Sequence, residues 1–319
     1  MNAVERVQDL GDRILGEATK VVQGQDEALR LLIVGLLVRG HVLLEGVPGT
    51  AKTLMVKAVA RAIDARFKRI QFTPDLMPSD ILGTSVFNLQ SRSFELHRGP
   101  VFTDLLLGDE INRAPAKTQS ALLEAMEERR VTLEGEAHRL PRIFTVFATQ
   151  NPVESEGTYP LPEAQLDRFT LKVRVDYPLP VDELEVLRRY DEGFDAHDLE
   201  GAGVHAVATE EDLIGARGAL AEIKTEPAVL EYVRGVVAAT RQSDRLSLGA
   251  GPRGSIHLLL CSKAMAALAG RDFATPDDVR EAALPVLRHR VVLSPEAELD
   301  GADPDDVLLE VMSRVEVPR

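Results

Sequence analysis

The sequence is poor in cysteine and aromatic residues, and it has fewer basic than acidic residues. It contains one cysteine, Cys261, and no tryptophan among 319 residues, so a disulfide within the chain is excluded. The 37 basic and 51 acidic residues give a net charge of −14. Proteins that bind nucleic acid usually present a basic surface. The charge therefore argues against DNA or RNA as the main partner.

The sequence also lacks a hydrophobic run long enough to cross a bilayer. Its longest apolar stretch, residues 31–38, is much shorter than the roughly 20 residues of a membrane-spanning helix. Residues 1–5 are polar and acidic, unlike the start of a secretory signal. A single cysteine fits a reducing compartment. We therefore expect a cytoplasmic protein with no membrane span.

Short apolar strands alternate with amphipathic helices in the first half of the chain. We expect strands at 41–44, 69–72, 103–107 and 143–148. We expect helices at 4–15, at 25–38, after residue 52 and at 116–130. This alternation predicts an α/β fold with a parallel sheet covered on both faces. Two hairpins, at 85–96 and 130–140, interrupt it.

The character of the sequence changes near residue 178. The strand pattern ends there, and the remaining sequence is helical, with helix-capping signals such as Thr209 followed by Asp212. We expect an α/β nucleotide-binding domain over residues 1–178 and a smaller all-α domain over residues 179–319.

A glycine-containing turn lies between the first strand and the helix after it. Gly46 would let the chain leave the strand, and Gly49 would let backbone N–H groups approach a phosphate. Lys52 would contact the β- and γ-phosphates of ATP, and the Thr53 hydroxyl would bind Mg²⁺. Ala51 replaces the usual glycine, and we expect it in the first helical turn, where alanine is not strained.

Polar residues end two further strands. Asp109 and Glu110 follow an apolar run, and Asn151 follows another. Ligand groups in α/β sheets gather at the carboxyl ends of strands. We expect Asp109 to hold Mg²⁺, Glu110 to activate the attacking water, and Asn151 to position that water. The alternatives are a solvent-facing acidic strand end and a simple Asn-Pro turn.

With these residues identified, the chain resembles the AAA+ ATPases, and among them the MoxR group. The resemblance rests on residues 109–115, 117–126 and 161–169, and on Ala51 in the phosphate loop. It is dense over residues 21–178 and looser in the helical domain, which corresponds to the lid of such proteins. This implies an AAA+ P-loop fold with an all-α lid.

The resemblance also implies roles for single residues. Asn151 corresponds to sensor 1. Arg168 corresponds to the arginine finger that reaches the γ-phosphate of a neighbouring subunit, and Arg253 to sensor 2, which would touch phosphate from the lid. The residues expected at the nucleotide are Val22, Gly24, Gln25, Gly46, Val47, Pro48, Gly49, Thr50, Ala51, Lys52, Thr53 and Leu54.

Similar proteins suggest a function. They are ATP-driven remodellers that assemble as hexameric rings and act on partner proteins, often ones with von Willebrand A domains, in maturation or metal insertion. The alternatives are a magnesium-chelatase-type motor subunit, a DNA-handling AAA+ motor, and a scaffold that scarcely hydrolyses ATP. The acidic charge opposes the DNA-handling motor, and intact Glu110 and Arg168 oppose the scaffold.

Overall fold

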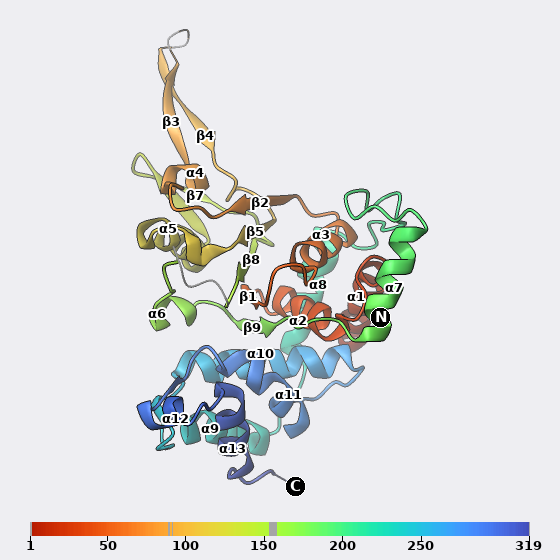
Figure 1. The fold of residues 1–319 in the computed structure, drawn as a ribbon, viewed down its shortest axis with the longest axis vertical. Coiled ribbons are helices and arrows are strands. Elements are labelled where there is room, and N and C mark those ends of the chain that lie inside the picture. The colour runs from red at the N-terminus through yellow and green to blue at the C-terminus, as the bar shows by residue number, and fades with distance from the viewer. Residues whose placement is uncertain (1, 89, 91, 153–157, 319) are drawn as a thin grey trace.

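A five-stranded parallel sheet forms the centre of the protein (Figure 1). The computed structural model describes residues 2–88, 90, 92–152 and 158–318. The strand order is β2, β5, β8, β1, β9, and all neighbours are parallel. The strands are β1 (Val42–Glu45), β2 (Phe67–Gln71), β5 (Leu105–Asp109), β8 (Thr145–Gln150) and β9 (Leu171–Arg174). The predicted parallel sheet is confirmed, with β9 as an additional strand.

The central strands are buried on both faces because their side chains alternate between two hydrophobic cores. In β1, Val42 and Leu44 belong to one core and Leu43 belongs to the other. Such continuous apolar runs are typical of parallel strands, which are covered on both sides. The first core is built with α1 (Ala3–Ala18), α2 (Asp26–Leu37) and α3 (Lys52–Ala62). The second is built with α4 (Pro78–Leu82) and α5 (Ala116–Glu128).

Helix α1 connects the two parts of the molecule. It begins with a capping box in which Asn2 and Glu5 bond each other's backbone N–H groups. Its apolar residues Val7, Leu10 and Ile14 are buried. The helix packs against α2 and α3, and also against α8 (Glu210–Ala219) and α10 (Pro252–Leu268). The N-terminal helix is thus part of the folded core.

The C-terminal part is mostly helical and lies below the sheet in Figure 1. Besides α10, its helices are α9 (Pro227–Thr240), α11 (Pro276–Leu287), α12 (Pro295–Leu299) and α13 (Pro304–Ser313). The expectation that only helices follow residue 178 is wrong, because β10 (Leu246–Leu248) pairs with β11 (Val292–Leu293). No helix in the described part of the chain is long and apolar enough to cross a membrane.

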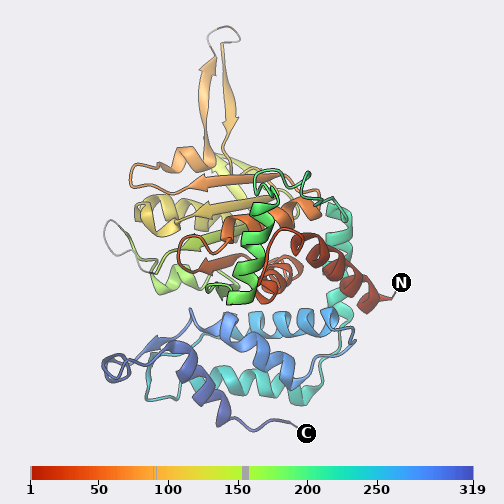
Figure 2. The ribbon, with the colours of Figure 1, turned by 45° about the vertical axis from the view of Figure 1, so that its right-hand side comes forward.

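Between β9 and α9 in the chain come α7 (Pro180–Asp191) and α8, and α7, coloured green, crosses the front of the α/β part in Figure 2. Helix α8 packs on α1 and α2. The proposed domain boundary at residue 178 therefore precedes two helices that accompany the α/β part, and it remains a prediction.

Both expected hairpins are present. The first consists of β3 (Gly83–Asn88) and β4 (Ser93–Arg98) and projects from the body at the top of Figure 1. The second consists of β6 (Arg130–Leu133) and β7 (Glu136–Arg139). Residue 89, the expected end of the first strand, lies outside the described residues.

Candidate active site

The loop between β1 and α3 takes the shape of a phosphate-binding loop. Gly49 has a φ of +86° and Ala51 a φ of +60°, both in the left-handed region. The expectation that Ala51 lies in the first helical turn is wrong, because it precedes α3 as the N-cap residue. A side chain costs roughly 1–2 kcal/mol in this conformation. The glycine usual at this position would avoid that cost.

Close packing, rather than an unusual backbone angle, explains Gly46. A Cβ atom on Gly46 would lie 2.3 Å from the carbonyl oxygen of Val175, just beyond β9. The Lys52 Nζ donates to the carbonyl oxygens of Gly46 at 2.7 Å and Val47 at 2.5 Å. Burial lowers the pKa of Lys52, while the nearby carboxylates of Asp109 and Glu110 oppose this shift. The Lys52 ammonium group thus lies inside the loop, where a phosphate would bind.

Asp109 ends β5 beside the loop and is buried. Its Oδ2 accepts from the Thr53 hydroxyl at 3.4 Å, and its Oδ1 accepts from the Thr149 hydroxyl. Arg69 also donates to Oδ2, from Nε at 3.0 Å and from Nη2 at 2.6 Å. A carboxylate next to a hydroxyl supplies the hard oxygen donors that Mg²⁺ prefers. Thr53 and Asp109 therefore fit this ion, with Arg69 competing for one oxygen.

Glu110 is fixed in an uncommon conformation. Its φ is +56°, and its backbone N–H donates to the Thr149 hydroxyl at 2.8 Å. Its carboxylate accepts from Gln71 Nε2 at 2.6 Å and forms an ion pair with Arg113 at 3.0 Å. Left-handed conformations of residues with side chains persist where the surroundings over-determine them. The contacts with Gln71 and Arg113 therefore fix the position of the Glu110 carboxylate.

Sequence reasoning missed Arg69, Gln71 and Thr149. Arg69 and Gln71 lie two residues apart on β2, so their side chains share one face of the sheet. Their importance follows from the strand order, which places β2 next to β5 with Gln71 opposite Asp109. Alternating polar residues on an edge strand otherwise indicate only an exposed face.

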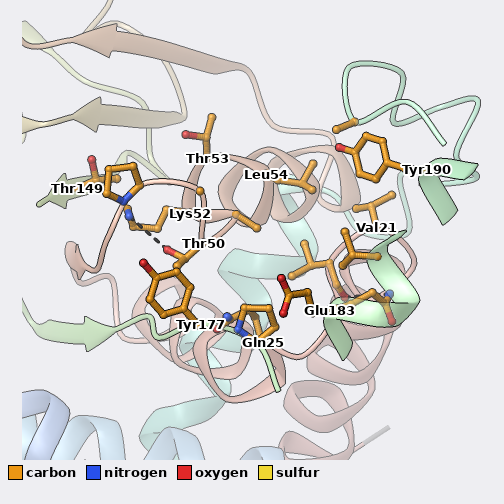
Figure 3. A pocket seen from close by; sticks show the side chains of 18 of the residues that line it. Val21, Gln25, Thr50, Lys52, Thr53, Leu54, Thr149, Tyr177, Glu183 and Tyr190 are labelled. Atoms are coloured by element: carbon orange, nitrogen blue, oxygen red, sulfur yellow. Dashed lines mark hydrogen bonds between the residues drawn. The ribbon is translucent and has the colours of Figure 1, made fainter. Parts of the chain in front are cut away.

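A cavity of about 730 Å³ is lined by Thr149 and by residues of the phosphate-binding loop (Figure 3). This volume is within the roughly 300–1,000 Å³ of ligand sites. Of the residues expected from sequence, the cavity lining includes Val22, Gln25, Pro48, Gly49, Thr50, Ala51, Lys52, Thr53, Leu54, Asp109, Glu110 and Asn151. Gly24, Gly46 and Val47 are not in that lining. Gly24, with φ +68°, instead lets the chain approach Asp182 of α7, because a Cβ there would lie 2.6 Å from its carboxylate.

Helix α7 and the residues after it form the second wall of the cavity. Leu187, Tyr190 and Phe194 line it together with Val21, which precedes α2. Figure 3 shows Tyr190 and Val21 at the same end of the cavity. The rings of Tyr190 and Phe194 meet edge to face with centroids 5.3 Å apart. This apolar end lies away from Lys52, so it suits a nucleobase while the loop suits phosphates. Sequence reasoning missed this wall.

Arg168 and Arg253 lie outside this cavity, and both form ion pairs with the same carboxylate. Arg168 follows α6 (Glu163–Leu166), and Arg253 is at the start of α10. Glu127 of α5 binds Arg168 Nε at 3.0 Å and Arg253 Nη2 at 2.7 Å. Neither arginine is in the cavity lining. The structure therefore does not bring Arg253 to the phosphate loop of its own chain, in contrast to the expected contact from the lid.

A buried arginine of the C-terminal part holds the same segment. Arg290 donates to the carboxylate of Asp167 at 2.8 Å and to the carbonyl oxygen of Phe169 at 2.5 Å. It also contacts His257 Nδ1 at 2.7 Å. Burial, followed by the nearby Arg290 and Arg253, lowers the pKa of His257 to about 3, so this ring is neutral near pH 7. The backbone on both sides of Arg168 is thus fastened to the lid.

Comparisons with known proteins agree with this geometry. The family described as "ATPase family associated with various cellular activities (AAA)" matches residues 41–171, and an AAA lid domain matches residues 238–311. The chain is 46% identical to the uncharacterized protein YeaC of Bacillus subtilis, over 96% of this chain and 95% of that protein.

Two further relatives extend the comparison. Chaperone MoxR1 of Mycobacterium tuberculosis is 42% identical over 97% of this chain and 82% of its own length. A crystal structure from Cytophaga hutchinsonii superposes with a TM-score of 0.90 at 38% identity, covering 99% of this chain and 97% of that one. These identities extend over nearly the whole chain, so they include both the α/β part and the lid. The chain therefore belongs to the MoxR family of AAA+ ATPases.

Proposed function

We propose that this protein binds ATP with Mg²⁺ in the cavity beside α7 and hydrolyses it. One observation carries the proposal: Lys52 and Thr53 of α3, Asp109 and Glu110 at the end of β5, and Asn151 after β8 line a single cavity. Carboxyl ends of parallel strands and the amino end of a helix are where α/β proteins bind phosphates.

Each residue has a separate task in this proposal. Lys52 neutralises the β- and γ-phosphates, and the positive end of α3 adds to their binding. Bound Mg²⁺, held by Thr53 and Asp109, would supply charge stabilisation at the phosphates. Glu110 orients the attacking water and accepts its proton, and Asn151 helps to place that water. The bonds from Gln71 and Arg113 keep the Glu110 carboxylate in position.

We propose further that Arg168 acts on a neighbouring subunit. It lies outside the cavity of its own chain and shares Glu127 with Arg253. Two guanidinium groups joined by one carboxylate could therefore be presented together to the nucleotide of the next copy. An interaction of this kind is head to tail. Repeating it gives a closed ring when the rotation between successive subunits adds up to a full turn. We propose a ring of six subunits, the number that the resemblance implies.

The proposed role of this ring is the remodelling of a partner protein. The printed name of one relative, Chaperone MoxR1, supports action on proteins. A partner with a von Willebrand A domain, in maturation or metal insertion, is the class that the resemblance implies. ATP-dependent movement of the lid would then pull on the segment that contains Arg168, because Arg290 fastens the two together.

Two substitutions test the ATPase assignment. Lys52→Ala should weaken ATP binding by about 10- to 100-fold, since it removes a charged hydrogen-bond donor. Glu110→Gln should leave binding nearly unchanged but slow phosphate release by roughly 10²–10⁴-fold, since it removes a general base. Titration with a fluorescent ATP analogue and a phosphate-release assay measure the two effects. Lys57→Ala, on the same helix but outside the cavity lining, is the control. Equal loss of binding in the first two variants would refute the assignment.

A further inference from the structure

Helix α7 has a reversed distribution of polar and apolar residues. None of its residues is buried, and the partly covered positions include charged Asp182 and Arg189. The outward positions include Val181, Leu184 and Leu187, which are 70%, 48% and 62% exposed. A surface helix normally turns its apolar stripe toward the core. Leu187 lines the cavity, and we call the other two, Val181 and Leu184, the α7 stripe.

Polar contacts hold α7 in this orientation. Asp182 packs against Gly24, where no side chain would fit. Arg189 donates to the carbonyl oxygen of Lys20, which lies outside α7. Rotation of the helix to bury the α7 stripe would break these contacts. The stripe therefore remains outward, at the rim of the cavity that Leu187 lines.

A second outward apolar stripe lies on α10, next to Arg253. Ile256 is 58% exposed and Leu260 is 36% exposed. These residues follow Arg253 by three and seven positions, so all three lie on one side of the helix. We call Ile256 and Leu260 the α10 stripe.

The charges on the two helices are complementary. Helix α7 has four acidic and two basic residues, a net charge of 2 − 4 = −2. Helix α10 has two basic residues, Arg253 and Lys263, and no acidic residue, a net charge of +2. Opposite net charges favour contact between the two helices and disfavour contact of either helix with itself.

The positions of the stripes fit contact between copies. Figure 1 shows α6, which precedes Arg168, on the left of the α/β part and α7 on the right. The Arg168 segment and α7 therefore lie on different sides of one copy, and in the proposed head-to-tail ring the first faces the second of the next copy. We infer that the α7 stripe of one copy is covered by the α10 stripe of the adjacent copy. This inference rests on the proposed function, in which Arg168 and Arg253 reach the adjacent nucleotide.

The contact has a physical advantage for the proposed ring. Every copy carries both stripes at different places, so each can cover one neighbour and be covered by the other. Apolar side chains that are exposed in the single chain would then be removed from water on assembly. This burial would occur beside the nucleotide, which itself contacts both copies. ATP binding and subunit contact would therefore strengthen each other.

Charge substitutions in the stripes test the contact. Leu184→Glu and Ile256→Glu should each weaken self-association with ATP and Mg²⁺ at least tenfold in sedimentation experiments. Leu299→Glu, a substitution of a highly exposed leucine on α12, should leave association unchanged. Binding of a fluorescent ATP analogue to the dilute variants should remain within twofold of wild type, which shows that they are folded. Wild-type association of both stripe variants would overturn the inference.

Cross-linking tests the pairing itself. Leu184→Cys and Ile256→Cys variants, mixed with ATP and Mg²⁺ and mildly oxidised, should give a disulfide-linked pair, whereas neither variant alone should. The native Cys261 is buried, and burial raises its pKa to about 12, so it does not compete. Absence of the mixed disulfide in assembled protein would refute the stripe contact. If mixed Arg168→Ala and Glu110→Gln subunits still regained ATPase activity, the proposed function would stand although the stripe contact had failed.

Discussion

Ala51 and Glu110 both carry side chains on left-handed backbone at the edge of the candidate active site. Such conformations each cost on the order of 1–3 kcal/mol and often occur at functional sites. Glu110 is supported by bonds from Thr149, Gln71 and Arg113. Ala51 has no side-chain polar group that could form such bonds, so its strain remains a local cost of the loop.

The substitution Ala51→Gly should raise the free energy of unfolding by about 0.5–1 kcal/mol. Glycine adopts a φ of +60° without steric cost, and this gain exceeds its extra entropy in the unfolded chain. Ala121→Gly, inside α5, should instead lower it by about 1 kcal/mol. Urea unfolding of both variants measures the difference. A loss of stability in Ala51→Gly would contradict the backbone conformation described for the loop.

The elements of the fold were predictable to different degrees. Strands β1, β5 and β8 are apolar runs that end in functional residues, so both their position and their role could be inferred. Strand β9 (Leu171–Arg174) alternates apolar and charged residues over four positions, too few to distinguish it from a loop. Helix α7 has its apolar face outward, so its pattern predicts a helix but not its role as a wall of the cavity.

The connection between the lid and the Arg168 segment depends on Arg290. Its side chain is almost fully buried and bonds both the side chain of Asp167 and the backbone near Arg168. Arg290→Met should therefore lower the free energy of unfolding by about 2–4 kcal/mol, because it leaves buried carbonyl groups without their donor and removes an ion pair of Asp167.

Arg314→Met, an exposed arginine in an ion pair with Glu310, is the matched control and should change stability by less than about 1 kcal/mol. Chemical unfolding followed by fluorescence of an attached dye measures both variants, since the chain has no tryptophan. Equal stability of the two variants would mean that Arg290 does not hold the lid to the Arg168 segment.

On the scale of the whole molecule, the candidate catalytic groups lie in two places. Lys52, Asp109 and Glu110 surround the cavity, whereas Arg168 and Arg253 meet at Glu127 outside it. The first group could be proposed from sequence, because a phosphate loop and a strand end are local patterns. The shared carboxylate could not be predicted, because it brings together α5, the segment after α6, and α10, which are far apart in the sequence.

Mixing inactive subunits tests the central claim that Arg168 completes the site of a neighbouring copy. Arg168→Ala alone should slow ATP hydrolysis by roughly 10³-fold or more, as removal of an arginine finger does. Glu110→Gln alone should also hydrolyse poorly. In a 1:1 mixture, about one quarter of the sites (1/2 × 1/2 for random head-to-tail assembly) combine an intact Glu110 with a neighbour's intact Arg168.

The mixture should therefore approach a quarter of wild-type activity after subunit exchange, far above the sum of the two variants. A mixture of Lys52→Ala with Glu110→Gln provides the control, because both residues belong to the same chain's cavity and no site becomes complete. ATPase rates are measured with co-assembly confirmed by sedimentation. Recovery in the Arg168 mixture alone is the result we predict, and no recovery in a co-assembled Arg168 mixture would contradict the account.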